Sequence, residues 1–314
     1  MAAEVRVVRL DALPAAEIAA LSRAALDRPL GGAAEVIVAV PADEAVVLGA
    51  FQRASELDEA LNHTSTTRRG SGGAEARVGP GSVWMQLALA RPDALVPCPP
   101  SRLLNRYVRP LLGAITKAGA LARYFDRDWI SARRSPVASV SFAHDTKSGR
   151  ALVEAIVAVD TPFAVRDRPS FMGREPLSLR ALGVARATGE VADAVIDAYA
   201  SAYGPAERSR EIPSHAGAID LHREPPWAAI REEPIGVVGA GRDAEGVLRV
   251  GGELMVSRDV LADLERVIAE SPHDPAAIER AIDALSGERV ALLGIRSLQS
   301  IRDVIFEALE LPRS

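Results

Sequence analysis

The segment Arg68–Gly73 reads Arg-Arg-Gly-Ser-Gly-Gly, a combination of residues that suits a bound anion. An arginine offers a planar charged fork for a phosphate or carboxylate. Glycines let the backbone turn and bring free N–H groups close to a ligand, and the serine adds a hydroxyl donor. The segment therefore predicts a cradle for a phosphoryl group, and an exposed Gly-rich turn is the alternative. The candidate ligand-binding residues in it are Arg69, Gly70, Ser71, Gly72, Gly73 and Ala74.

The overall charge means that any anion must be captured by such a local site. The chain has 314 residues, with 37 Lys and Arg against 42 Asp and Glu, so its net charge is −5 at pH 7. A chain of this charge has no general basic field to hold nucleic acid or an anionic membrane surface. With 48% hydrophobic and 25% charged residues, the composition is typical of a soluble globular protein.

The sequence contains no signal for membrane insertion, export or a metal site. No stretch approaches the roughly 18 apolar residues of a membrane span. The N-terminus carries Glu4 and Asp11 and has no apolar core of a signal peptide, which predicts a cytoplasmic protein. The single Cys98 excludes an internal disulfide framework and a cysteine-based metal cluster. The histidines are scattered without a pair at ligand spacing, so no metal ligands are predicted.

The expected elements predict an α+β fold with a mixed or antiparallel sheet and flanking helices. Apolar residues recur at helical spacing or in short β-branched runs. Helices are expected at residues 14–27, 53–61, 101–120, 190–203, 258–270, 275–286 and 298–311, and strands at 34–40, 44–51, 82–90, 128–131, 136–143, 151–159 and around a turn within 235–257. A loop rich in Pro, His and charge, 204–233, separates a predicted first domain, 1–233, from a small α+β accessory domain, 234–314.

Two details of this pattern bear on a site. The strands between 128 and 159 are closely spaced, as in an antiparallel meander. The helix 101–120 has one apolar stripe, and a kink is expected at Pro110. Together with the strand 82–90 it would supply a hydrophobic slot for an aliphatic chain.

Other glycine motifs do not meet their structural requirements. "GVVGAGRDA" imitates the dinucleotide-binding fingerprint, but strand-like residues follow where a helix must begin. No Gly-Lys-Ser/Thr completes a P-loop after Gly70.

Several segments, in order, resemble the lipoate-protein ligase family of the biotin/lipoate ligase superfamily. "RRGSGG" is similar to the family's Arg-Arg-x-Ser/Thr-Gly-Gly-Gly-Ala signature, and "VVLGAFQ" to its strand ending in Gly-x-x-Gln. "LNRYVRPLLGAI" is similar to the helix that follows, and "DRDWIS" to the Gly-Arg-Asn-Asp segment, with Asp128 at the last Asp. "ALVEAIVAV" resembles a later family strand, and the tail from Ile235 resembles the accessory domain of full-length ligases.

The resemblance implies a ligase fold whose loop wraps an acyl-adenylate. It implies ATP and lipoate, or lipoyl-AMP, as ligands, leaves Mg²⁺ open as the nucleotide's counter-ion, and makes a lysine of a lipoyl domain the acyl acceptor. Besides the loop, the implied ligand-binding residues are Asp128, Ser135, Val137 and Ala138.

The chain departs from the family at the catalytic lysine, which follows the Asp by seven residues. That position is Ser135, and Ala138 replaces the glycine of the Lys-x-x-Gly run. Arg133 and Arg134 are the nearest substitutes; in a continuous strand, Arg133 would share the face of Ser135. Losing such a donor typically lowers a rate by about 10²–10³.

Two hypotheses therefore stay open. The chain is a lipoate-protein ligase-like enzyme that binds lipoate or lipoyl-adenylate and transfers the acyl group to a lipoyl domain. Alternatively, it is a catalytically inactive ligase homologue that acts as a ligand-binding or scaffold protein.

Overall fold

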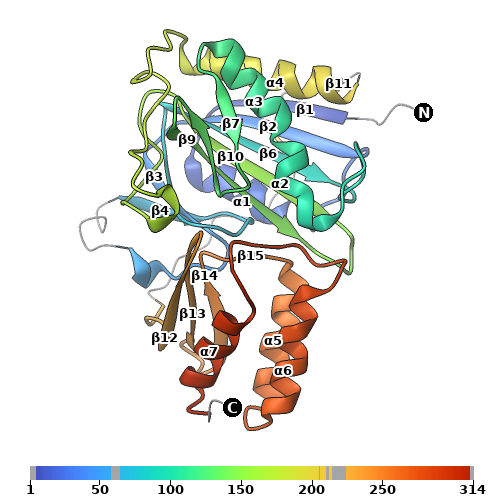
Figure 1. Ribbon diagram of the computed structural model, residues 1–314. Helices are drawn as coiled ribbons and strands as arrows, with labels where there is room; N and C mark the ends of the chain where they lie inside the picture. The colour runs from blue at the N-terminus through green and yellow to red at the C-terminus, as the bar shows by residue number, and fades with distance from the viewer. Residues whose placement is uncertain (1–4, 58–63, 205, 210–211, 214–223, 312–314) are drawn as a thin grey trace.

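The computed structural model describes residues 5–57, 64–204, 206–209, 212–213 and 224–311, and the structural statements below refer to these. Most of them form two units, a larger N-terminal one and a smaller C-terminal one (Figure 1).

The N-terminal unit is built on an eight-stranded sheet with the order β11-β1-β2-β6-β10-β9-β8-β7. β1 is parallel to both of its neighbours, β11 and β2, and the other pairs are antiparallel. The strands are β1 Val5–Leu13, β2 Ala34–Pro41, β6 Ser82–Leu89, β7 Ala122–Tyr124, β8 Trp129–Ala132, β9 Ser135–His144, β10 Ala151–Ala158 and β11 Ala206–Ser209. The sheet is mixed, as predicted, and β8, β9 and β10 form the predicted antiparallel meander.

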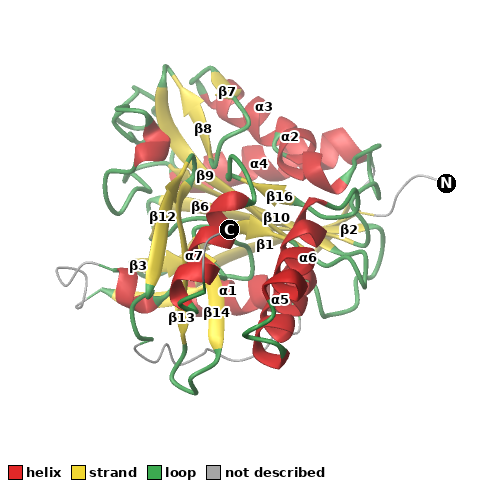
Figure 2. Ribbon diagram, turned by 60° about the horizontal axis from the view of Figure 1, so that its bottom comes forward, coloured by secondary structure: helices red, strands yellow, loops and turns green. Residues whose placement is uncertain are grey.

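Both faces of this sheet are covered (Figure 2). The helices α2 (Leu103–Tyr107), α3 (Arg109–Ala118) and α4 (Thr188–Tyr203) cover one face. α1 (Ala15–Ala24) and a three-stranded sheet, ordered β4-β3-β5, cover the other. The small sheet consists of β3 Ala45–Leu48, β4 Ser65–Arg68 and β5 Ala76–Val78.

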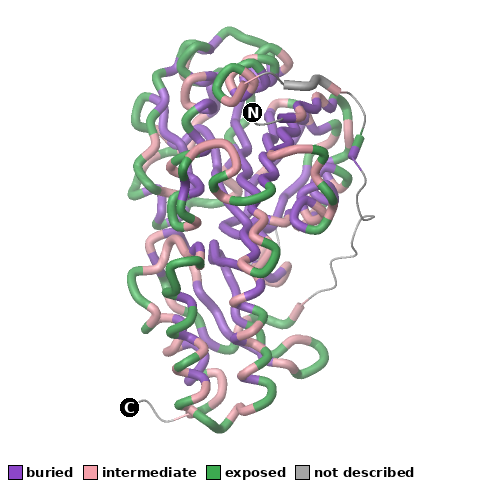
Figure 3. Tube along the Cα trace, turned by 90° about the vertical axis from the view of Figure 1, so that its right-hand side faces the viewer, coloured by how far each residue is buried: buried purple, intermediate pink, exposed green. Residues whose placement is uncertain are grey.

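Alternation along the strands divides the apolar side chains between two cores. On β2, Val36 and Val38 join the core under α2–α4, whereas Ile37 joins the core under α1. Figure 3 shows the resulting buried interior of the unit. The predicted long helix is interrupted between α2 and α3, just before Pro110, whose ring cannot continue the hydrogen-bond ladder.

Two segments differ in secondary structure from the prediction. The predicted helix 53–61 is a short 3-10 helix over Ala54–Glu56, and residues 58–61 lie outside the described residues. The predicted loop 204–233 contains β11 and, after the undescribed residues 214–223, β12 (Ala229–Glu233).

The C-terminal unit combines an antiparallel sheet, β12-β13-β14, with three helices. Its elements are β13 Gly236–Arg242, β14 Leu248–Gly252, β15 Met255–Val256, α5 Arg258–Glu270, α6 Pro275–Asp283, β16 Leu292–Leu293 and α7 Gln299–Ala308. It has its own core, which includes Val238, Leu264 and Ile305. Because β12 pairs with β13, this sheet begins at Ala229.

No helix among the described residues is long and apolar enough to cross a membrane.

Candidate functional site

The loop after β4, residues 69–73, is packed inside the protein. Arg69 is 1% exposed and Ser71 is fully buried. The loop lies among the end of α1, the strands β9 and β10, and the C-terminal unit, because it forms hydrogen bonds with residues of each. The exposed turn that was the alternative interpretation of this segment is therefore excluded.

Each backbone amide from Gly70 to Gly73 has an acceptor within the protein. The amide of Gly70 donates to Ser22 Oγ at 2.7 Å, and that of Ser71 donates to the Glu154 carboxylate at 3.2 Å. The amides of Gly72 and Gly73 donate to the carbonyl oxygens of Phe142 at 3.0 Å and Leu254 at 2.8 Å. The free N–H groups expected of a phosphate cradle are thus engaged in this structure.

The guanidinium of Arg69 is also held by the loop itself. It donates to Ser71 Oγ at 2.9 Å and to the carbonyl oxygens of Gly72 and Ala74 at 2.7 and 2.8 Å. A longer bond of 3.4 Å reaches the carbonyl of Val47. Burial lowers the pKa of Arg69 to about 10, although the carboxylates of Glu154 and Glu75 oppose this change. The fork expected to hold a phosphate instead organises the loop backbone.

The glycines are needed because the loop passes very close to other backbone segments. A Cβ at Gly72 would lie 2.1 Å from the carbonyl oxygen of Leu254, and one at Gly70 would lie 2.4 Å from that of Ser22. Atoms that close overlap, so no side chain fits at either position. At both glycines, the group that approaches closely is the protein's own backbone, where the sequence predicted a ligand.

Glu154 is the internal anion of this site. Its carboxylate is buried and accepts hydrogen bonds from Ser22 Oγ at 2.7 Å, Trp84 Nε1 at 2.9 Å and the amide of Ser71. Buried charges persist when hydrogen bonds and an opposite charge compensate them, and Arg69 supplies that charge.

A second charged group lies beside the loop and links the two units. The Nη2 atom of Arg168 is 2.8 Å from the Asp128 carboxylate and 2.7 Å from that of Glu253, and all three side chains are buried. The pair with Asp128 lacks hydrogen-bond geometry, since neither Asp128 oxygen has a hydrogen-bond partner among the described residues. Asp128 lies close enough to the loop for its charge to act on Arg69, and it forms an ion pair with an internal arginine, Arg168.

Arg166 extends this group toward Glu75, the residue that follows the candidate loop. It lies 2.8 Å from Glu75 and 2.9 Å from Glu253, and Gln52 donates to Glu75 at 2.6 Å. The arginines and Gln52 lower the pKa of Glu75 despite its burial. Burial, assisted by the charge of Glu75, raises the pKa of Glu253 to about 7.

The position implied for the catalytic lysine lies away from this loop. Ser135 begins β9, whereas Ser141, whose hydroxyl is 2.7 Å from that of Ser71, lies six residues further along the strand. At about 3.4 Å per residue the two positions are roughly 20 Å apart. The structure therefore does not bring Ser135 and the loop together.

Arg133 and Arg134 do not continue a strand into Ser135, so the shared face expected of Arg133 and Ser135 is wrong. Ala132 pairs directly with Ser135, and the two arginines form the turn between β8 and β9. Both have positive φ, 47° and 76°, as a two-residue hairpin turn requires. This turn precedes β9, at the end of the strand opposite to the loop.

The remaining implied residues lie in the core. Val137 and Ala138 are fully buried in the core under α2–α4. Met85 and Leu87 of β6 and Leu111 and Ile115 of α3 belong to the same core and are fully buried. These side chains of β6 and α3 therefore pack into the core, where the sequence predicted a slot for an acyl chain.

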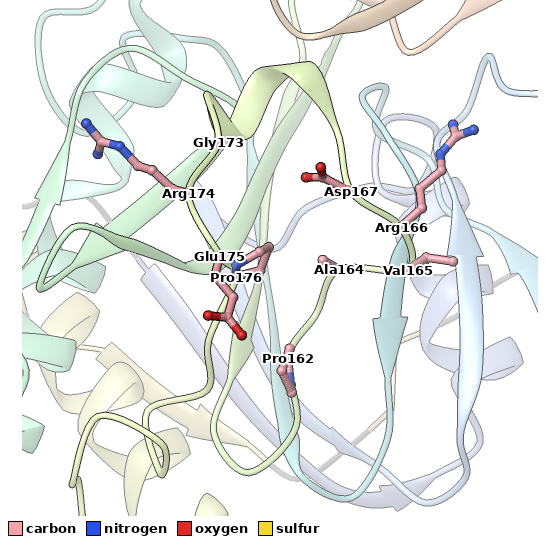
Figure 4. A pocket seen from close by; sticks show the side chains of 9 residues that line it. All are labelled: Pro162, Ala164, Val165, Arg166, Asp167, Gly173, Arg174, Glu175 and Pro176. Atoms are coloured by element: carbon pink, nitrogen blue, oxygen red, sulfur yellow. The ribbon is translucent and has the colours of Figure 1, made fainter.

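A cavity of about 470 Å³ lies over the segment 162–176 (Figure 4). Its lining includes Arg166, Asp167, Arg174 and Glu175. Arg166 and Arg174 extend from it in opposite directions, Arg166 toward the ion pairs already described.

Four residues of the site, Glu154, Arg166, Arg168 and Glu253, were not predicted from the sequence. Glu154 interrupts an apolar run, "ALVEAIVAV", and a charge within a buried strand must find a partner. "RDR" at 166–168 has no comparable signal, because its partners are distant in the sequence.

Comparisons with known proteins give the class of the fold. No family model matches the sequence, and neither does any curated protein. A lipoate protein ligase of Thermoplasma acidophilum, described as bi-partite and solved with its E2 lipoyl domain, matches with 17% identity and a TM-score of 0.54, over 67% of this chain and 88% of that one. A lipoate-protein ligase A bound with ATP matches with 17% identity and a TM-score of 0.54, over 67% and 90%.

P. falciparum LipL1, in complex with lipoate, matches with 10% identity and a TM-score of 0.61, over 96% of this chain and 99% of that one. Coverage of this extent includes the C-terminal unit. The chain therefore has the fold of lipoate-protein ligases, which confirms the α+β ligase-like fold that the sequence predicted.

Proposed function

We propose that the chain is a lipoate-protein ligase homologue that does not form an acyl-adenylate and acts as a binding or scaffold protein. The observation that carries this proposal is the internal pairing of the loop, in which every amide from Gly70 to Gly73 and the guanidinium of Arg69 donate to protein acceptors. The ligase fold supports the family assignment.

The residues present do not fit ATP or lipoyl-AMP at this loop. An anionic phosphate there would compete with the Glu154 carboxylate for the amide of Ser71, and like charges at one site repel. It would also have to displace the backbone of Leu254, which accepts from Gly73. With Ser135 at the position of the family's lysine, no ammonium is supplied there to hold the phosphate.

An acylation assay tests the proposal. The full chain is incubated with ATP, Mg²⁺, lipoate and an apo lipoyl domain, and acylation of the domain is followed by intact mass spectrometry. We expect no acylated domain above a protein-free control, while a known lipoate ligase under the same conditions acylates it fully. Acylation that depends on this chain would overturn the proposal.

Thermal stabilisation tests whether the chain binds lipoate or a lipoyl domain, or instead binds the adenylate at the loop. Ligands that bind the folded state raise Tm, by an amount that grows with ligand concentration over Kd. A shift with lipoate, or with the apo lipoyl domain, and none with lipoyl-AMP supports a binding or scaffold role. A larger shift with lipoyl-AMP than with lipoate would show that the loop opens to an adenylate.

A further inference from the structure

A hollow at the edge of the large sheet has a chemistry unlike that of the loop. Its volume is about 440 Å³, within the usual range of small-molecule sites. It lies beside the last strand, β7, and the β8–β9 turn. Its main lining residues are Leu121, Arg123, Phe125, Arg133, Arg134 and Arg174.

The four arginines make the hollow strongly positive. Within the described part of the chain, none of these four forms an ion pair with a carboxylate, and the residues that line the hollow include no Asp or Glu. Arg174 donates at 3.5 Å to the carbonyl of Arg134, and its guanidinium lies 5.5 Å from the Trp129 ring. In a chain of net charge −5, so many uncompensated guanidinium groups in one hollow provide a local site for an anion.

The backbone at two of these arginines, Arg133 and Arg134, has an unfavourable conformation. The β8–β9 turn places both of its residues at positive φ, where Asn-Gly is the preferred pair. Arg133 and Arg134 adopt that conformation with long side chains, which destabilises the backbone. Strain of this kind persists mainly at functional sites. Both of these residues line the hollow.

The hollow also has an apolar wall. Leu121, Arg123 and Phe125 alternate along β7 and its ends, so they share one side of the strand. Leu121 and Phe125 are 58% and 56% exposed, although they are large hydrophobic residues. Exposed apolar surface beside several cations suits a ligand that has both an apolar part and an anionic part.

We propose that this hollow binds a small amphipathic anion, a carboxylate or phosphate attached to an aliphatic or aromatic group. The guanidinium groups would bind the anionic head through charge-assisted hydrogen bonds, and Leu121 and Phe125 would cover the apolar part. The proposal does not depend on the loop at Ser71, so it stands apart from the proposed function.

Calorimetric titration of the full chain with octanoate tests the proposal. Two comparison ligands divide octanoate into its parts: acetate has the carboxylate without the long aliphatic chain, and octanol has the chain without the carboxylate. Octanoate is expected to bind at least about tenfold more tightly than either, because only octanoate satisfies both parts of the site. Absence of octanoate binding, or equal binding of acetate, would overturn the amphipathic assignment.

The double variant Arg133→Asn/Arg134→Gly locates the site and tests the strain argument together. It restores the preferred turn pair and removes two cations, so we expect octanoate to bind about tenfold or more weakly while Tm rises. Arg266→Gln, an exposed arginine of α5, is the matched control and should leave the affinity unchanged. Unchanged affinity in the double variant contradicts the proposal.

A second variant keeps the test decisive if the double variant unfolds. Arg123→Gln changes an exposed side chain of β7 and leaves the turn intact. It should weaken octanoate binding several-fold with little change in Tm. Affinity equal to that of the unmodified chain would place the ligand elsewhere and overturn the proposal.

Discussion

The Glu154 carboxylate lies 3.2 Å from the amide nitrogen of Ser71 and accepts a hydrogen bond from it, although the two residues are 83 positions apart in the sequence. The same carboxylate accepts from Ser22 and Trp84, so one buried anion joins α1, the loop, β6 and β10. The loop that the sequence predicted as a cradle for a phosphoryl group thus holds a carboxylate of its own chain at the amide of Ser71.

Replacing this carboxylate by its neutral isostere should destabilise the fold. In Glu154→Gln, an amide NH₂ replaces one acceptor oxygen, so at least one donor loses its partner: Trp84 if the NH₂ replaces Oε1, or both Ser22 and Ser71 if it replaces Oε2. An unsatisfied buried donor costs about 1–3 kcal/mol, and Arg69 also loses a compensating charge. Urea unfolding measures the effect, with the exposed Glu175→Gln as control. Equal midpoints for the two variants would contradict the role assigned to Glu154.

The guanidinium of Arg69 should be irreplaceable by an ammonium. Arg69→Lys keeps the charge but cannot reach Ser71, Gly72 and Ala74 from one planar group. We expect a loss of about 2–4 kcal/mol in the free energy of unfolding, with or without lipoyl-AMP. Arg91→Lys, on the surface, should change stability by less than about 0.5 kcal/mol. A lysine variant as stable as the parent would show that the hydrogen bonds to the loop are dispensable.

A methyl group at Gly72 should separate the loop from the C-terminal unit. The Cβ of Gly72→Ala would meet the carbonyl oxygen of Leu254 at 2.1 Å, and neither backbone can yield without losing hydrogen bonds. We expect a lower Tm and faster amide exchange at Gly73. Gly113→Ala is the matched control: its Cβ has nothing within 4 Å, and alanine in a helix interior is about 0.5–1 kcal/mol better than glycine. A rise in Tm for both variants would contradict the close contact.

The charge of Glu253 should make stability depend on pH. Its pKa in the folded protein is raised to about 7, from an ordinary value of 4.5. Between these values the folded chain binds more protons than the unfolded chain, so this group's contribution is complete below pH 4.5 and is lost as the pH rises to 7. Each tenfold difference in proton affinity between the folded and unfolded chains corresponds to about 1.4 kcal/mol.

The difference between the parent chain and Glu253→Gln isolates that contribution. Glu75, whose pKa is lowered, acts in the opposite sense and loses its contribution as the pH falls, but it is present in both proteins. We expect the parent to lose stability relative to the variant as the pH rises from 4.5 to 7, as measured by urea unfolding at several values. Parallel curves over this range would show that Glu253 titrates normally.

The sequence predicted the elements that local patterns specify. The apolar stripe of 101–120, the β-branched runs of β2 and β6, and the meander β8–β10 all formed. β1 was missed because Arg6, Arg9 and Asp11 leave only short apolar runs in it. The β8–β9 turn was missed because arginines occupy positions that usually hold Asn and Gly.

For the candidate site, the sequence could predict where the loop lies but not which groups it bonds. The resemblance implies that the Arg68–Gly73 segment lies near Asp128, and in the structure the charge of Asp128 acts on the buried guanidinium of Arg69. Which groups the loop would bond, however, depends on Ser22, Glu154 and Leu254, which only the folded chain brings together. No spacing rule relates residues from three distant segments.

Cutting the chain between its two units would leave charged side chains without their ion-pair partners in each fragment. A fragment ending before Ala228 would keep Arg166 and Arg168 but lose the carboxylate of Glu253, and Gly73 would lose its acceptor on Leu254. The complementary fragment would carry that carboxylate without either of its arginine partners. Because one covalent chain carries both units, these ion pairs and this hydrogen bond stay assembled at any protein concentration.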